Sequence, residues 1–214
     1  EPDATQPELD PLVTNAQASG NEDVSRLLIS VAAGAIHGAP EHARRLGNLL
    51  ARAGSESRSD LVYPLCEALL TCAEVAKDAT LTGEAWALAQ RLQGYDAVNM
   101  LTDGGRRVAG SGVGDPRPWI DAALRAIERW DDPTTTATRR AIVAEALRLH
   151  GAAAESAREW ATALGESRNA TRSAFFGVLK ELLAGLKNDP RLPAIASALS
   201  ETEAWWPHRT VWVP

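Results

Sequence analysis

The chain has 214 residues, a formal net charge of −6 and an isoelectric point near 5.3. This length fits one domain or two small ones, and it lets the chain bury about 70% of the surface that it exposes when unfolded. The acidic balance argues against a nucleic-acid binder and against binding to anionic membranes, because both ligands favour a basic protein face. Basic residues are mostly Arg and Ala is abundant, which indicates a GC-rich, bacterial coding sequence.

The sequence begins at Glu1, so a processed chain or a piece of a longer protein is expected. The first residues lack a signal-peptide pattern, and the longest apolar stretch, Leu27 to Ile36, is too short to cross a bilayer. Cys66 and Cys72 stand six residues apart in one predicted helix, where they point to different faces and cannot bond to each other. Two buried free thiols and a cytoplasmic protein are therefore predicted.

Helical spacing of apolar residues runs through nearly the whole chain. Residues 1–20 are predicted to be flexible or weakly ordered, with a short helix from Pro7 to Ala18. The N-terminal helical half, residues 21–102, opens with a helix over 22–37, in which one set of apolar residues recurs at helical spacing: Val24, Leu27, Leu28, Val31 and Ala35.

Four further helices complete this half. They are predicted to begin at Pro40, at Ser59-Asp60, at Thr82 (as the cap) and at Tyr95, after a break at Gly94. The helix from Pro40 is expected to bury Ala43, Leu46, Leu50 and Ala53. Pro64 must then lie in the first turn of the helix that runs through Asp78.

The segment TDGGRRVAGSGVG has five glycines between positions 104 and 114, and it is predicted to be a loop over residues 103–114. A phosphate-cradling turn is the alternative, but that motif needs a preceding strand and a Gly-Lys-Ser/Thr ending, and neither is present. The sequence therefore predicts a mobile loop that separates two helical halves.

The C-terminal helical half, residues 115–206, has two Asp-Pro pairs that cap helices, Asp115-Pro116 and Asp132-Pro133. Its predicted helices carry Ile120 to Ile127, Ile142 to Leu149, Trp160 with Leu164, and Ala170 to Leu186, and a last helix begins near Pro193. The fold class predicted from these patterns is all-α, with about ten helices in an array of antiparallel hairpins, either solenoid-like or an irregular bundle.

The pentapeptides ATRRA (137–141) and ATRSA (170–174) match at an offset of 33 residues, which favours an internal repeat. At this offset Arg139 corresponds to Arg172. Equivalent positions of a solenoid line up along one surface, so both arginines are candidate partner-binding residues that grip carboxylates of an acidic peptide. The alternative is that both are solvated and pair with nearby acids.

The stretch EAWALAQRLQGYDAVNML, residues 84–101, has Trp86 and Leu92, then Gly94, Tyr95 and Ala97. In this order it resembles the first helix, turn and second helix of a tetratricopeptide repeat, over about one repeat. The resemblance implies an array of helical hairpins that binds peptides or protein partners and has no chemistry of its own.

Residues that carry chemistry are sparse. Asp131-Asp132 could bind a metal, as in prenyl-diphosphate enzymes, but capping by Asp132 explains the pair with fewer assumptions. His37 and His42 lack a third ligand nearby, and no Ser or Cys lies in a nucleophile motif. No cofactor, metal or catalytic residue is predicted.

The chain ends EAWWPHRTVWVP, with an extended tail predicted over 207–214. Trp206 is expected to be a core residue of the last helix, whereas Trp205 and Trp212 are candidate partner-binding residues. The tail has three readings: it seals the end of the array, it begins a following domain, or it is a strand that docks on a partner.

The function predicted from the sequence is a non-catalytic interaction or regulatory domain, part of a larger bacterial protein or complex. Its partner is a protein or peptide, not nucleic acid or membrane, and the sequence leaves its oligomeric state undetermined. An all-α enzyme with a site spread over several helices and a structural assembly subunit are the alternatives.

Overall fold

A computed structural model of the protein describes residues 9–19, 21–55 and 59–185. In this part of the chain ten α-helices and two short 3-10 helices form, and no strand. The α-helices are α1 (Leu9–Ala18), α2 (Glu22–Ala35), α3 (Ala43–Ser55), α4 (Val62–Ala76), α5 (Ala79–Ala89), α6 (Gly94–Ser111), α7 (Arg117–Glu128), α8 (Pro133–Leu149), α9 (Ala153–Asn169) and α10 (Arg172–Gly185). The 3-10 helices are Pro40–His42 and Ser59–Leu61.

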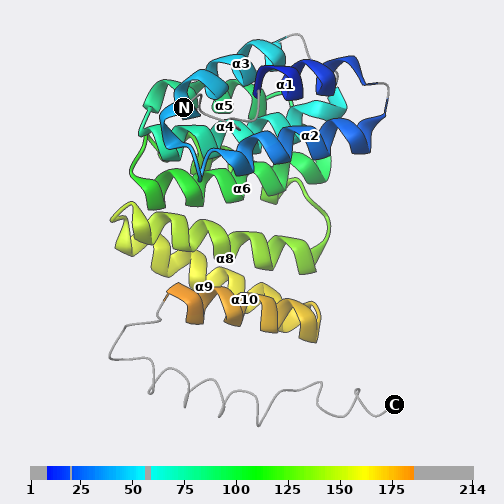
Figure 1. Ribbon diagram of the computed structural model, residues 1–214. Coiled ribbons are helices and arrows are strands. Elements are labelled where there is room, and N and C mark those ends of the chain that lie inside the picture. The colour runs from blue at the N-terminus through cyan, green and yellow to red at the C-terminus, as the bar shows by residue number, and fades with distance from the viewer. Residues whose placement is uncertain (1–8, 20, 56–58, 186–214) are drawn as a thin grey trace.

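The helices form an array in which nearly all consecutive helices pack against each other, most extensively α8 with α9, α4 with α5 and α3 with α4. Figure 1 shows the array running from α1 and α3 at the top to α10 at the bottom. The even-numbered helices pack one against the next and make one layer of the array, and the odd-numbered helices lie behind them. The predicted all-α class and hairpin array are confirmed.

The two layers are not equally tight. In the even layer α2, α4, α6, α8 and α10 form an unbroken series of contacts, whereas in the odd layer α7 has no comparable contact with α5 or α9. Moreover, Arg106 of α6 reaches across α8 to Glu181 of α10, with 2.9 Å between Nη1 and Oε2. The even layer is therefore the inner side of a curved array from α6 to α10, because only inward curvature brings α6 and α10 within reach of one ion pair.

One hydrophobic core runs through most of the array, from Val13 of α1 to Leu147 of α8. A smaller cluster joins α8, α9 and α10 through Ala137, Ala141, Ala163 and Val178. Small side chains at these positions let the last three helices approach closely. The large cluster includes residues on both sides of the predicted Gly-rich loop, so no break in the core separates the two predicted halves.

The predicted loop over 103–114 is wrong, because α6 is helical through Ser111. Gly104 and Gly105 face Trp119 of α7, and a Cβ on Gly104 would lie 2.3 Å from Cζ3 of Trp119. The glycines thus create a concave site on α6 in which Trp119 is 1% exposed. Helix propensity disfavours these glycines, but burial of a tryptophan side chain outweighs that cost.

The real turn after α6 is shorter than predicted. Gly112 and Gly114 have φ angles of 66° and 97°, in the region where a residue with a side chain is strained. Thr82 of α5 donates a hydrogen bond from Oγ1 to the carbonyl of Val113, 3.0 Å away, and holds the turn. Thr82 is therefore a buried interior residue of α5, and Asp78 is the cap, accepting from the N–H of Thr80.

Other local predictions are confirmed. Asp132 caps α8 by accepting from the N–H groups of Thr134 and Thr135, and Pro64 lies in the first turn of α4. Cys66 and Cys72 are free and buried. Four predicted residues of α3 are buried: Ala43, Leu46, Leu50 and Ala53.

The N-terminal prediction is partly wrong. Residues 9–18 form α1, which buries Val13 and Ala16 against α2 and α3, so this part of residues 1–20 is ordered by packing. The short helix predicted there is confirmed. The last predicted helix, Trp206 and the tail over 207–214 lie outside the described residues.

The offset-33 repeat does not match the array. Helices α6, α8 and α10 begin at Gly94, Pro133 and Arg172, each 39 residues after the last. Arg172 therefore opens α10, whereas Arg139 stands well inside α8. The predicted equivalence of these two arginines is wrong, because the matching pentapeptides occupy different turns of their helices.

We expect the glycines of α5 and α6 to respond oppositely to alanine. Gly104→Ala should lower the free energy of unfolding by about 1–3 kcal/mol, because the new Cβ collides with Trp119. Gly83→Ala in α5 should raise it by about 0.5–1 kcal/mol, because nothing lies within 4 Å of the added Cβ. Urea denaturation followed by circular dichroism measures both, and a neutral Gly104→Ala would contradict the packing described.

Candidate functional site

The solvent-facing, inner side of the even layer carries a row of polar side chains. Tyr63, Glu67, Thr71 and Glu74 recur at spacings of four, four and three residues along α4, which places them on one side of that helix. Asp103 and Arg107 are one turn apart and lie on one side of α6, the next helix of the layer. The row exists because the two helices are parallel neighbours, so their polar stripes lie side by side.

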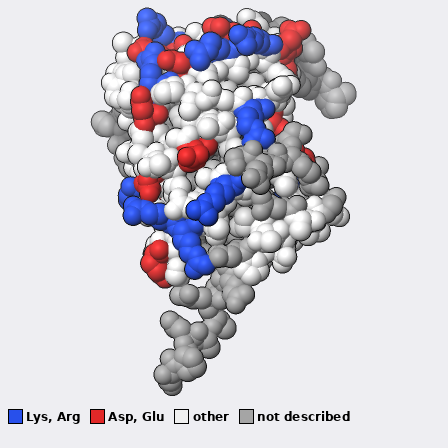
Figure 2. All heavy atoms as spheres, turned by 90° about the horizontal axis from the view of Figure 1, so that it is seen from above, with Lys and Arg blue, Asp and Glu red and all other residues white. Residues whose placement is uncertain are grey.

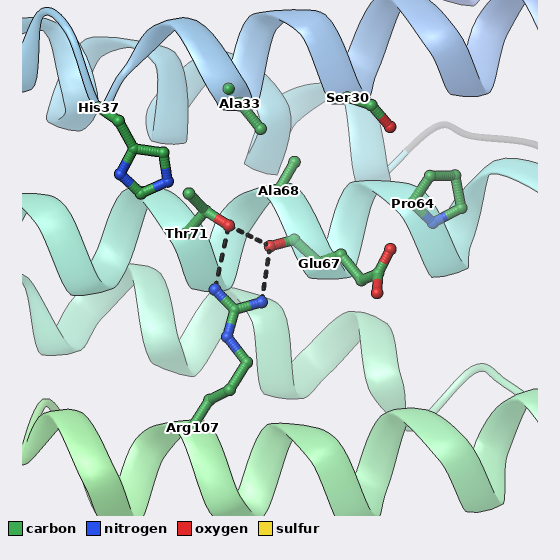
Figure 3. A pocket seen from close by; sticks show the side chains of 9 residues that line it. Ser30, Ala33, His37, Pro64, Glu67, Ala68, Thr71 and Arg107 are labelled. Atoms are coloured by element: carbon green, nitrogen blue, oxygen red, sulfur yellow. Dashed lines mark hydrogen bonds between the residues drawn. The ribbon is translucent and has the colours of Figure 1, made fainter.

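A groove opens where α2 meets this row. It is lined by Ser30, Ala33 and Gly34 of α2 and His37 just after it, by Pro64, Glu67, Ala68 and Thr71 of α4, and by Arg107 of α6. Gly34 leaves open space, since a Cβ there would meet no atom within 4 Å. Figure 3 shows Arg107 rising from α6 toward Thr71, while the carboxylate of Glu67 extends along α4 in the direction of Pro64.

Arg107 is held by α4. Its Nε and Nη2 donate to the two carboxylate oxygens of Glu74 at 2.8 and 2.7 Å, and Nη2 also donates to Oγ1 of Thr71. Its Nη1 donates to the backbone carbonyl of Glu67 at 3.4 Å. Burial acts to lower the pKa of Arg107, but the hydrogen bonds and charge of Glu74 outweigh it and the pKa is raised. The guanidinium is thus a fixed wall of the groove.

Glu67 is in the opposite situation. In the part of the chain that the structure describes, its carboxylate accepts no hydrogen bond and forms no ion pair, although Arg107 is near. The side chain is solvent-exposed, yet partial burial of the carboxyl group raises its pKa. The charge of Arg107 lowers this pKa, and the charge of Asp103 raises it further. Tyr63, one turn earlier, has its pKa raised to about 12 by burial and by the charges of Glu67 and Asp103. Burial, rather than a surplus of negative charge, is therefore the largest cause of the raised pKa of Glu67.

The two arginines predicted to bind a partner lie apart. Arg139 is only 18% exposed and donates from Nη1 to Asp103 of α6 at 2.9 Å, so it joins α8 to α6. Arg172 is exposed, and its guanidinium lies 5.3 Å from the ring centroid of Phe176. The structure does not bring them together. Trp205 and Trp212, the other predicted partner-binding residues, lie outside the described residues.

Three apolar residues of the set predicted for α2 face outward, although Leu28 of that set packs against the core. Val24, Leu27 and Val31 are 44%, 63% and 49% exposed, and we call them the α2 stripe. The buried face of α2 consists instead of Ser25, Ile29, Ala32, Ala33 and Ile36. Ser25 is accommodated because its Oγ donates to the carbonyl of Ala16 at 2.7 Å. Hydrophobic spacing alone did not identify this face, because Ser25 and two alanines lie on it between the larger residues Ile29 and Ile36.

The α2 stripe borders the groove. At about 100° per residue, Gly34 projects about 20° from Leu27 around α2, and Ser30 projects about 60° from Leu27. Ser30 and Gly34 line the groove, so the stripe forms its outer rim on the α2 side. An apolar ridge and a groove that contains both an acidic and a basic side chain, Glu67 and Arg107, are therefore one continuous surface.

A second hollow lies on the outer side of α3, lined by Arg44, Arg45, Asn48, Leu49 and Arg52. Arg44 pairs with Asp78 at 2.8 Å, and Arg45 and Arg52 also interact with other residues. Figure 2 looks down on this end of the array and shows acidic side chains among the basic ones. This surface is a mixed-charge face whose arginines are engaged.

The remaining candidates do not form a site. In the described ranges no three His, Cys, Asp or Glu residues are grouped so as to hold a metal ion, and Asp132 serves as a cap. Burial raises the pKa of the Cys66 thiol, and it raises that of Cys72 to about 12. Both thiols are therefore protonated at neutral pH. No helix in the described part of the chain combines the length and apolarity that a bilayer span requires.

Comparisons with family models, with curated proteins and with solved structures gave no match to this chain. The segment 84–101, which resembles a tetratricopeptide repeat, does form a helix, a turn and a second helix, as α5 and α6. The function is therefore inferred from the surface of the protein itself.

Sequence reasoning missed Glu67, Thr71 and Arg107. Arg107 was assigned to a loop, so its contact with α4 was not expected. The signal that was available is the spacing of Tyr63, Glu67, Thr71 and Glu74, which marks a polar stripe on an otherwise apolar helix.

Glu67→Gln should stabilise the fold at neutral pH. The pKa of Glu67 is higher in the folded chain than in the unfolded chain, where it is about 4.3. Protonated Glu67 therefore contributes stability below this unfolded pKa, and the contribution is lost as the pH rises through the folded pKa. Glutamine avoids this loss, so the free energy of unfolding should rise at pH 7, by less than about 1 kcal/mol since solvent screens an exposed group.

Urea denaturation at several pH values measures this gain, which should vanish below about pH 4. Glu128→Gln, at an exposed position at the end of α7, is the matched control and should change little. A loss of stability in Glu67→Gln at pH 7 would mean that the carboxylate has a structural partner.

Proposed function

We propose that the protein is a non-catalytic interaction module that binds a protein or peptide segment along the α2 stripe and the adjoining groove. The observation that carries the proposal is the exposure of Val24, Leu27 and Val31 on one face of a helix. Single exposed apolar residues are ordinary, but a contiguous apolar ridge beside a groove is typical of an interaction site.

The shape of this surface suits a helix or an extended segment. Apolar positions at i, i+3 and i+7 match the anchor spacing of helix-in-groove recognition. The groove lies between two parallel helices of the layer, so a bound segment would lie alongside α2 and contact α4 on its other side. Parallel placement lets several side chains of the segment make contact at once.

The charged groups of the even layer support binding rather than catalysis. Arg107 is committed to Glu74 and Arg139 to Asp103, so both act as structural links between helices. The thiols are buried and protonated. A catalytic site needs a reactive group with access to substrate, and these side chains do not offer one.

Two finer features belong to the proposal. The buried free thiols favour a reducing compartment, and we place the protein in the bacterial cytoplasm on that basis and on codon-related composition. The same stripe could instead join two copies of the chain, which is the assembly-subunit alternative, and the oligomeric state distinguishes the two.

Leu27→Asp should abolish partner binding without unfolding the protein. Peptides of about 16 residues, long enough for four helical turns, are selected by phage display on the wild-type protein and then synthesised. Their affinity should fall at least about tenfold on Leu27→Asp, the scale of one buried leucine side chain. The melting temperature should hardly change, because Leu27 is 63% exposed.

Leu149→Asp is the matched control, since Leu149 is an exposed leucine at the end of α8, outside the stripe. It should leave peptide affinity unchanged. Selected peptides that bind wild type and Leu27→Asp equally would reject this surface as the binding site.

A further inference from the structure

We infer that Glu67 receives a cationic side chain of the bound segment, so that the partner is an amphipathic segment with a Lys or Arg beside its apolar anchors. This inference rests on the proposed function and specifies the chemistry of the partner. It assigns to Glu67 the role of a specificity-determining residue on an otherwise apolar docking surface.

The first support is that the carboxylate has room for a donor. Glu67 lines the groove and is solvent-exposed, and no described residue donates to either of its oxygens. Figure 3 shows the carboxylate directed along α4 toward Pro64, away from the guanidinium of Arg107. Both oxygens can therefore accept hydrogen bonds from a group that enters the groove.

The second support is that Arg107 is bound elsewhere. Four hydrogen bonds hold its guanidinium, two to Glu74, one to Thr71 and one to the backbone carbonyl of Glu67. A move toward the Glu67 carboxylate would break the bidentate pair with Glu74, which is the stronger arrangement. Arg107 therefore does not neutralise the Glu67 carboxylate by direct contact, although its charge lowers the pKa of that carboxylate.

The third support is the partial desolvation of Glu67. Burial is the largest cause of its raised pKa, Asp103 also raises that pKa, and the charges of Arg107 and Arg26 lower it. Asp103 is itself paired with Arg139. A cation that enters here still meets a carboxylate in a partly desolvated place, where a charge-assisted hydrogen bond is worth more than in water.

The fourth support is position. Ser30 of the groove lies between Leu27 and Val31 of the stripe in the sequence, and Figure 3 places Ser30 on the same side of the groove as Pro64, toward which Glu67 extends. A segment with apolar side chains on the stripe would thus present its neighbouring side chain to Glu67. Lys and Arg fit best, since their methylene stems can cross apolar surface and leave the charged end at the carboxylate.

The test uses the full chain and the synthetic peptides selected by phage display. We expect the selected sequences to combine apolar anchors with at least one Lys or Arg. Glu67→Gln should weaken the best peptide about tenfold or more in isothermal titration calorimetry, while Glu128→Gln leaves its affinity unchanged.

A double-mutant cycle identifies the contact. Replacing the basic residue of the peptide by Gln should weaken binding to wild type, but it should have little further effect on Glu67→Gln, because the same interaction is already lost. Additive effects of the two changes would overturn the inference, and so would selected peptides that lack basic residues.

The outcomes separate this inference from the proposed function. Peptides that need Leu27 but ignore Glu67 would overturn the role of Glu67 and leave the docking surface in place. Peptides that do not need Leu27 would overturn both. Sedimentation that shows a dimer in wild type and a monomer in Leu27→Asp would assign the stripe to a second copy of the chain and reject both statements.

Discussion

The contact of Trp119 with Gly104 and Gly105 is the constraint on which the array depends. The indole lies against the backbone of α6, and its ring centroid is 5.2 Å from that of Trp86 on α5. One side chain of α7 therefore joins α5, α6 and α7 at the middle of the chain. This contact offsets the low helix propensity of the two glycines. Arg106 and Arg107 therefore project from a continuous helix.

The two arginines that follow the glycines form ion pairs in opposite directions along the even layer. Arg107 pairs with Glu74 of α4, and Arg106 reaches over α8 to Glu181 of α10. Together with the pair of Arg139 and Asp103, they connect the even layer from α4 to α10 by charged contacts. At the α2 end the layer instead presents the groove and the α2 stripe. The inner face thus divides into a closed part, where charges satisfy one another, and an open part, where Glu67 and three apolar side chains have no such partner in the described chain.

Local chemistry made much of the fold predictable. The Asp132-Pro133 pair fixed the start of α8, and apolar spacing located the helices and the buried residues of α3. Prediction failed where a distant residue decides the outcome. The glycines of α6 were predicted to form a loop because the sequence around them does not show that Trp119 packs against them. The face of α2 was misjudged because Ser25 finds a backbone acceptor on α1. Arg139 was predicted to bind a partner from its place in an apparent repeat, whereas it pairs with Asp103 of α6.

Gly34 gives the groove a property beyond its present shape. It stands in the last turn of α2, with a right-handed backbone and empty space in front of it, so a side chain there would not disturb the core. Each such side chain would narrow the groove by a different amount or add a different charge. The shape and charge of the groove can therefore change with a single codon while the packing of the array is kept.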